Sequence, residues 1–165
     1  MNPKKLIFLL GIYLFQVSSW AQSDPLEKFI DKYSGKPGFR YVEAETDILG
    51  FITGEESEDV EARLMAYRQD STTNFSIAEI TEAFAKRLRT KHYEMLVGFN
   101  RKGSRAEFHV RRKGSEITGI AITMLQKERA VFFSATGEFD LKDAGKLKEI
   151  IKCELPGLMK QFCRE

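Results

Sequence analysis

Residues 93–137 read YEMLVGFNRKGSRAEFHVRRKGSEITGIAITMLQKERAVFFSATG, and apolar side chains recur at every second position through most of this stretch. A period of two places successive side chains on opposite faces of a β-strand. The polar segments RKGS, RKGS and QKER interrupt the alternation, and the glycines of the first two favour the positive φ that tight turns require. The stretch therefore predicts four antiparallel strands joined by hairpins.

The tetrapeptide RKGS occurs twice, and six basic side chains fall between Arg101 and Ser115. Such a cluster suggests either a polyanion-binding site or two turns. Consecutive turns of a meander lie at opposite ends of the strand between them, which at about 3.4 Å per residue separates them by roughly 20 Å. We interpret the repeat as two turns and keep polyanion binding as the alternative.

A helix is predicted upstream of the meander. Ser76 and Glu79 form a capping box, and Phe75 with Ile80 supplies the accompanying hydrophobic staple. The apolar positions then recur at helical spacing: Ile77, Ile80, Phe84 and Leu88. Glu82, Lys86 and Arg87 are expected in solvent.

Shorter elements precede and follow this core. Asp24 and Pro25 begin a helix that Gly35 ends, FRYVEAE forms a short strand, and Asp140 caps a last helix that Pro156 stops. Residues 47–70 are ambiguous and are predicted as a helical turn followed by a strand. The expected fold is one α+β domain: an antiparallel sheet, comprising a four-strand C-terminal meander plus one or two N-terminal strands, with amphipathic helices packed on one face.

The first residues resemble a secretory signal peptide. Lys4 and Lys5 precede an apolar run from residue 6 to residue 15, and small residues place cleavage between Ala21 and Gln22. The run is shorter than the roughly 20 residues that span a bilayer, so a retained anchor is the weaker alternative. We expect residues 1–21 to be removed and residues 22–165 to form a periplasmic or secreted domain without a stable membrane anchor.

Charge and motifs restrict the function further. Removal of the leader takes away two lysines and no acids, which leaves 24 basic and 24 acidic side chains. A neutral chain has no overall electrostatic field to attract nucleic acid, and nucleic acid is not expected as a partner.

The two histidines, His92 and His109, are predicted at the surface. The chain has no nucleotide, metal or nucleophile motif, so no cofactor, metal or catalytic residue is assigned. Catalysis by scattered carboxylates stays open.

The two cysteines, Cys153 and Cys163, have Pro156 and Gly157 between them. An even cysteine count in an exported chain favours a disulfide, and two reduced thiols are the alternative.

The last two strands of the meander are apolar on both faces. Ala121, Leu125 and Phe132 are expected on the face away from the helices. Either the C-terminal tail covers this face through Leu158, Met159 and Phe162, or the three residues form a partner face.

The phrase SATGEFDLKDAGKL, residues 134–147, follows the hairpin strands, and together with the preceding block it resembles domain of unknown function 4252. This family comprises small exported proteins of Gram-negative bacteria, many of them lipoproteins. The resemblance covers most of the mature chain and implies the α+β fold and export, but no catalytic residues. The lipoprotein cysteine is missing here.

The sequence therefore favours a non-enzymatic periplasmic interaction or sensing module, which binds an envelope protein or forms a homodimer through its sheet face. A small-ligand-binding protein or an enzyme with a pocket between sheet and helices is the alternative.

Overall fold

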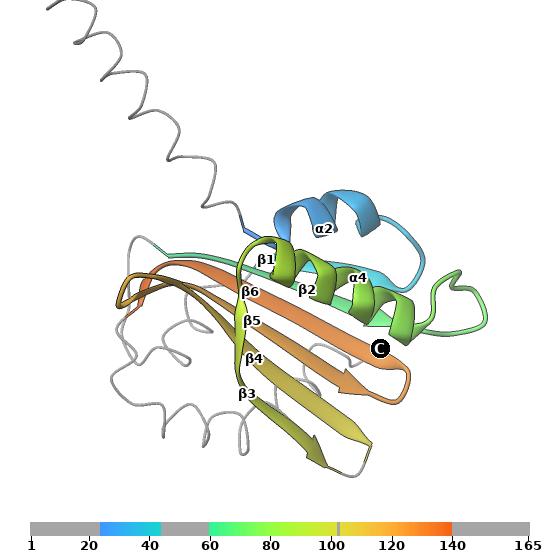
Figure 1. Cartoon of the computed structure of the whole chain (residues 1–165). Coiled ribbons are helices and arrows are strands. Elements are labelled where there is room, and N and C mark those ends of the chain that lie inside the picture. Colours follow the sequence, from blue (N-terminus) through green and yellow to red (C-terminus); the bar gives the residue numbers. More distant parts are fainter. Residues whose placement is uncertain (1–23, 44–59, 102, 140–165) are drawn as a thin grey trace, which may run out of the picture.

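A computed structural model describes residues 24–43, 60–101 and 103–139 (Figure 1). Six antiparallel strands form one sheet in the order β1-β2-β6-β5-β4-β3, and two helices lie on one of its faces. In chain order the elements are α2 (Glu27–Tyr33), β1 (Phe39–Glu43), β2 (Glu61–Arg68), α4 (Ile77–Thr90), β3 (Glu94–Arg101), β4 (Ser104–Lys113), β5 (Glu116–Gln126) and β6 (Arg129–Phe139). The architecture is α+β, as the sequence predicts.

Strands β3 to β6 pair in chain order. Gly103 and Gly114 have φ values of 80° and 65°, which confirms the backbone role predicted for the two RKGS glycines. The third turn has no glycine, and Lys127 adopts a φ of 49° there. Because the ten-residue strand β4 separates the two RKGS turns, the turns lie at opposite ends of one strand.

Strand β2 extends the meander at β6, and β1 pairs with β2 at the outer edge. Residues 61–68 thus form the strand predicted within the ambiguous segment. Residues 44–59, which include the predicted helical turn, lie outside the described residues.

Helix α4 begins with the predicted capping box. The Ser76 hydroxyl accepts a hydrogen bond from the backbone N–H of Glu79, and the Glu79 carboxylate accepts one from the backbone N–H of Ser76. At the other end His92 adopts a left-handed φ of 59°, and Tyr93 donates its backbone N–H to the carbonyl of Leu88. His92 donates its own backbone N–H to the carbonyl of Arg89, and the two bonds together form a Schellman motif with a histidine where glycine is usual.

The sequence predicted Asp24 as the cap of helix α2, and this prediction is wrong. The helix begins at Glu27, three residues after Asp24. Leu26 holds the cap position, and Asp24 Oδ1 accepts a hydrogen bond from the Leu26 N–H. Gly35, with a φ of 77°, follows the helix end as expected. The helix predicted after Asp140 lies outside the described residues.

The two faces of the sheet correct one expectation from the sequence. Ala121 and Phe132 are fully buried beneath α2 and α4, and Leu125 packs against the same cluster. The residues predicted to form an open partner face therefore face the helices. The physical reason is fit: Ala121 is small enough to leave room for helix side chains, and Phe132 packs among rings from both helices, at 5.2 Å from Phe29 and 4.9 Å from Phe84.

The opposite face carries a second apolar cluster. Its central members are Ile120, Ile122, Met124, Val131 and Phe133, all at most 4% exposed. The sequence offers the C-terminal tail as a cover for the partner face. The tail residues concerned, Leu158, Met159 and Phe162, lie outside the described residues.

Candidate functional site: a basic groove between the helices

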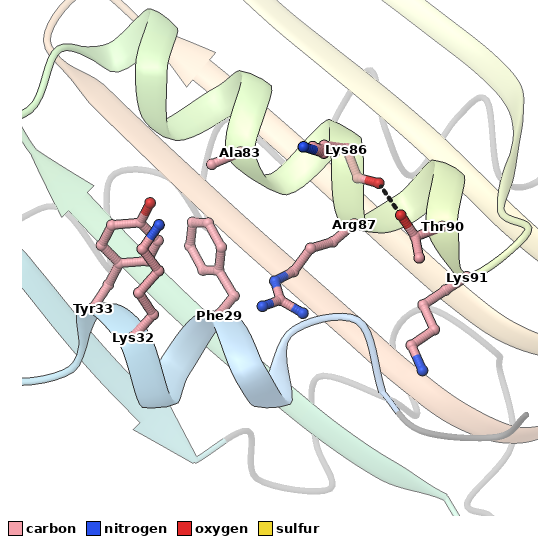
Figure 2. Close-up of a pocket in the computed structure, with 8 residues that line it drawn as sticks. All are labelled: Phe29, Lys32, Tyr33, Ala83, Lys86, Arg87, Thr90 and Lys91. Carbon is pink, nitrogen blue, oxygen red and sulfur yellow. Dashed lines mark hydrogen bonds between the residues drawn. The ribbon is translucent and has the colours of Figure 1, made fainter. Parts of the chain in front are cut away.

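A groove of about 330 Å³ opens between α2 and α4 (Figure 2). The two helices run in opposite directions, so that Ala83 lies across from Phe29 while Lys91 lies beyond the start of α2. The groove is lined by Phe29, Lys32, Tyr33, Ala83, Lys86, Arg87, Thr90 and Lys91.

One wall of the groove is a stripe along α4. Ala83, Arg87 and Lys91 follow one another at intervals of four residues and so lie on one line along the helix surface. This line runs beside the buried face formed by Ile80, Phe84 and Leu88. The amphipathic pattern that fixes α4 on the sheet therefore also fixes where its cations point.

The floor of the groove is aromatic. Phe29 and Tyr33 are 1% and 3% exposed, and their ring centroids lie 4.6 Å apart. Lys32 Nζ lies 4.9 Å from the centroid of the Tyr33 ring, within the range of a cation–π interaction. Side chains of the core thus support the groove from below.

The electrostatics of the groove are one-sided. Four of its eight lining residues are cationic, and none carries a carboxylate. Within the described part of the chain, the side chains of Lys86 and Arg87 have no ion-pair partner, whereas Arg89, on another side of α4, contacts Glu82 at 2.6 Å. A helix C-terminus favours cations on any of its sides. It does not require them to face a neighbouring helix across a groove.

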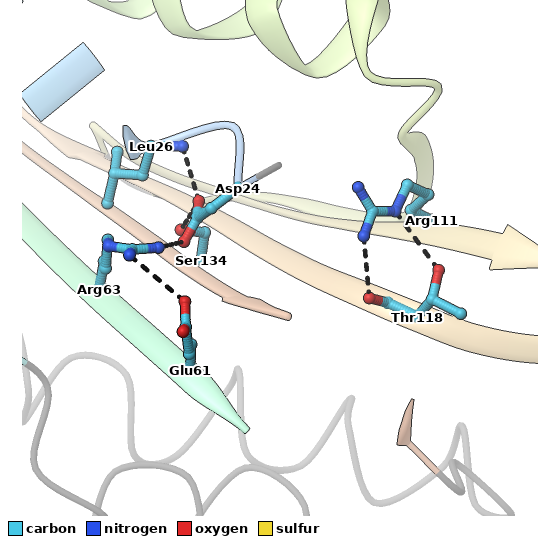
Figure 3. A network of polar contacts seen from close by, with 7 residues as sticks. All are labelled: Asp24, Leu26, Glu61, Arg63, Arg111, Thr118 and Ser134. Atoms are coloured by element: carbon cyan, nitrogen blue, oxygen red, sulfur yellow. Dashed lines mark hydrogen bonds and ion pairs between the residues drawn. The ribbon is translucent and has the colours of Figure 1, made fainter. Parts of the chain in front are cut away.

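A separate polar centre joins α2 to the sheet (Figure 3). The Asp24 carboxylate, 2% exposed, accepts hydrogen bonds from the Leu26 N–H, the Ser134 hydroxyl at 2.5 Å and the Arg63 guanidinium at 2.7 Å. Burial acts to lower the pKa of Arg63, but the hydrogen bond and charge of Asp24 outweigh it and raise that pKa. Because each Asp24 oxygen has a donor, the centre is suited to anchoring.

A second buried polar centre surrounds Tyr93. Its ring covers Gly119, where an added Cβ would lie 2.9 Å from Tyr93 Cζ, and the Arg111 guanidinium carbon lies 5.4 Å from the ring centroid. Arg111 also donates to Thr118 and is 6% exposed. The buried Tyr93 hydroxyl has no hydrogen-bond partner among the described residues. Burial raises the pKa of Tyr93 far above its ordinary value, Arg111 opposes the rise, and Asp24 adds to it.

Neither histidine forms a hydrogen bond described for the two polar centres. His92 is exposed at the end of α4, as predicted. The His109 side chain is only 13% exposed, which makes it more buried than predicted, and its Nε2 lies 4.0 Å from a Glu107 carboxylate oxygen. Burial lowers the pKa of His109, and Glu107 opposes this shift.

Other expected features can be placed only in part. Across residues 24–43, 60–101 and 103–139 there is no group of three or more His, Cys, Asp or Glu side chains placed to hold a metal ion. No described helix has the length and apolar character needed to cross a membrane. The predicted cleavage site, Ala21 and Gln22, and the predicted disulfide partners, Cys153 and Cys163, lie outside the described residues.

The sequence pattern did not reveal the groove as a site. Lys86 and Arg87 were interpreted as a solvated helix face, because the packing of α2 against α4 cannot be predicted from local periodicity. One feature of the sequence could have indicated the groove: residues 86–91 contain four cationic residues and no acidic residue.

Comparison with known families supports the resemblance seen in the sequence. The family model described as domain of unknown function (DUF4252) matches residues 33–147. The chain belongs to the DUF4252 family. The match begins at Tyr33, the last residue of α2, so that Asp24 and most of α2 precede the part that defines this DUF4252 domain. No curated protein and no solved structure matches the chain.

Proposed function

We propose that this DUF4252 protein is an exported, non-enzymatic interaction or sensing module that binds an envelope partner through the groove between α2 and α4. The observation that supports this proposal most directly is the groove itself, with four cations above a buried aromatic floor. Export is supported by the leader-like residues 1–21, and periplasmic location is part of the same proposal.

A binding role agrees with how the buried polar groups are used. Asp24 accepts three hydrogen bonds and Arg111 donates to Thr118, so these charged groups stabilise the fold. The groove differs because its cations surround an open space and Lys86 and Arg87 lack ion-pair partners within the described residues. The sequence suggested a partner face formed by Ala121, Leu125 and Phe132. These residues pack beneath the helices and therefore cannot contact a partner.

The proposal is tested by site-specific photo-crosslinking in intact cells. A photoreactive amino acid replaces Thr90, an exposed residue that lines the groove, and a control protein carries it at exposed Lys113, the last residue of β4. We expect a discrete adduct from position 90 alone, in the periplasmic fraction, with a mature protein beginning at Gln22. Equal labelling from both positions, or retention of the protein in the cytoplasm, would contradict the proposal.

A further inference from the structure

We infer that the groove binds an acidic peptide segment of its protein partner, in which carboxylates flank an apolar side chain. This inference rests on the proposed function and adds the chemistry of the partner. It is carried by the charge, the length and the floor of the groove.

Charge complementarity indicates an anionic ligand. The groove gathers four cations in a chain whose predicted mature form is neutral overall. Lys86 and Arg87 lack a carboxylate partner within the described segments, so a ligand can pair with them without first breaking an internal ion pair. Complementary charges of this kind steer association and determine the partner more than they add affinity.

The length of the groove favours a chain over a single small anion. Ala83 and Lys91 are eight residues apart, which corresponds to about 12 Å along a helix at 1.5 Å per residue. Lys32 lies near one end of the groove and Lys91 at the other (Figure 2). A single phosphate cannot contact cations at both ends, whereas about four residues of extended peptide, at roughly 3.3 Å each, span this distance.

The floor distinguishes a peptide from a membrane surface or a nucleic acid. Surface-binding helices insert protruding apolar side chains into lipid, and single-stranded nucleic acids stack on exposed aromatic faces. Phe29 and Tyr33 are 1% and 3% exposed and therefore can do neither. The open space of about 330 Å³, next to the small side chain of Ala83, has room for an apolar side chain placed between two carboxylates.

The inference is tested with the mature chain and a fluorescent hexapeptide of alternating glutamate and leucine. Two control peptides replace either every glutamate with lysine or every leucine with serine. We expect saturable binding of the first peptide, weaker binding of the serine peptide and none of the lysine peptide. Binding should weaken as salt is added, because the pairs lie at the surface.

Variants locate the binding on the protein. Arg87→Gln and Lys91→Gln should each weaken peptide binding about fivefold, the equivalent of one exposed charge pair. Ala83→Phe should fill the groove and abolish binding, while Lys113→Gln should leave it unchanged. Circular dichroism of each variant verifies that the fold is retained.

Three outcomes would overturn the inference: no binding of the acidic peptide, equal weakening by Lys113→Gln, or groove-dependent binding of phosphatidylglycerol vesicles or inorganic phosphate in place of the peptide. If position 90 still crosslinks to a partner when the acidic peptide fails to bind, the proposed function stands and only the partner chemistry is wrong. If position 90 gives no adduct in cells, the proposed function itself fails.

Discussion

Two buried polar centres lie on the helix-covered side of the sheet, and their hydrogen bonds differ. At the first, the Asp24 carboxylate accepts bonds from Arg63, Ser134 and a backbone N–H. At the second, the Tyr93 hydroxyl is buried without a partner among the described residues. Removal of a buried group that is hydrogen-bonded leaves its partners without a hydrogen bond. Removal of a buried group that has no hydrogen bond leaves no such partners. Similar substitutions at the two centres should therefore change stability in opposite directions.

The largest effect is expected for Asp24→Ala. The change leaves the buried Ser134 hydroxyl and the partly buried Arg63 guanidinium without their acceptor and should lower the free energy of unfolding by about 3 kcal/mol. Urea denaturation measures the change. Glu61→Ala is the matched control, because the Glu61 side chain is 73% exposed, and a loss within about 0.5 kcal/mol is expected. Equal losses would show that Asp24 is not an anchor.

Gly119→Ala tests the packing at the second centre. The added Cβ would collide with the Tyr93 hydroxyl and lie 2.9 Å from Cζ, so the free energy of unfolding should fall by about 1–3 kcal/mol. Because the nearest atom is the hydroxyl, the loss should be smaller in a Tyr93→Phe background. A double-mutant cycle gives this coupling, and strict additivity would mean that Tyr93 does not cover Gly119.

Tyr93→Phe should have the opposite sign from Asp24→Ala. It removes a buried hydroxyl that has no described partner and should raise the free energy of unfolding by about 1 kcal/mol, or the melting temperature by about 2–4 °C. Tyr67→Phe is the control because the Tyr67 hydroxyl donates to the carbonyl of Phe75, and about 1 kcal/mol should be lost there. A loss at both tyrosines would indicate an ordered water at Tyr93.

The smallest effect is expected from pH at His109, since Glu107 opposes the effect of burial on its pKa. The unfolded chain binds a proton at this residue near pH 6.5, and the folded chain does so only at lower pH. The stability contributed by neutral His109 is therefore present above about pH 6.5 and is lost as pH falls through the folded-state pKa. Urea midpoints between about pH 7.5 and 5 should fall more steeply for the natural chain than for His109→Gln. Parallel curves would assign the pH dependence to other groups.

Local patterns predicted the elements well where one interaction dominates. The Ser76–Glu79 capping box involves neighbours in sequence and begins α4 as predicted. The two RKGS glycines take positive φ because the turns themselves demand it. Asp24 shows the limit: it was predicted as a helix cap, but its strongest partners, Arg63 and Ser134, come from β2 and β6.

The sequence alone determined the period-two strands, the start of α4 and membership of the DUF4252 family, because each depends on neighbouring residues or on residue identity. The tertiary structure decided which face of β5 and β6 receives the helices, the burial of Arg111 and the groove itself. A strand that is apolar on both faces has no local preference for either side. Only the fit of the aromatic side chains of α2 and α4 around Ala121 and Phe132 fixes that choice, and with it the place where the cations of α4 meet α2.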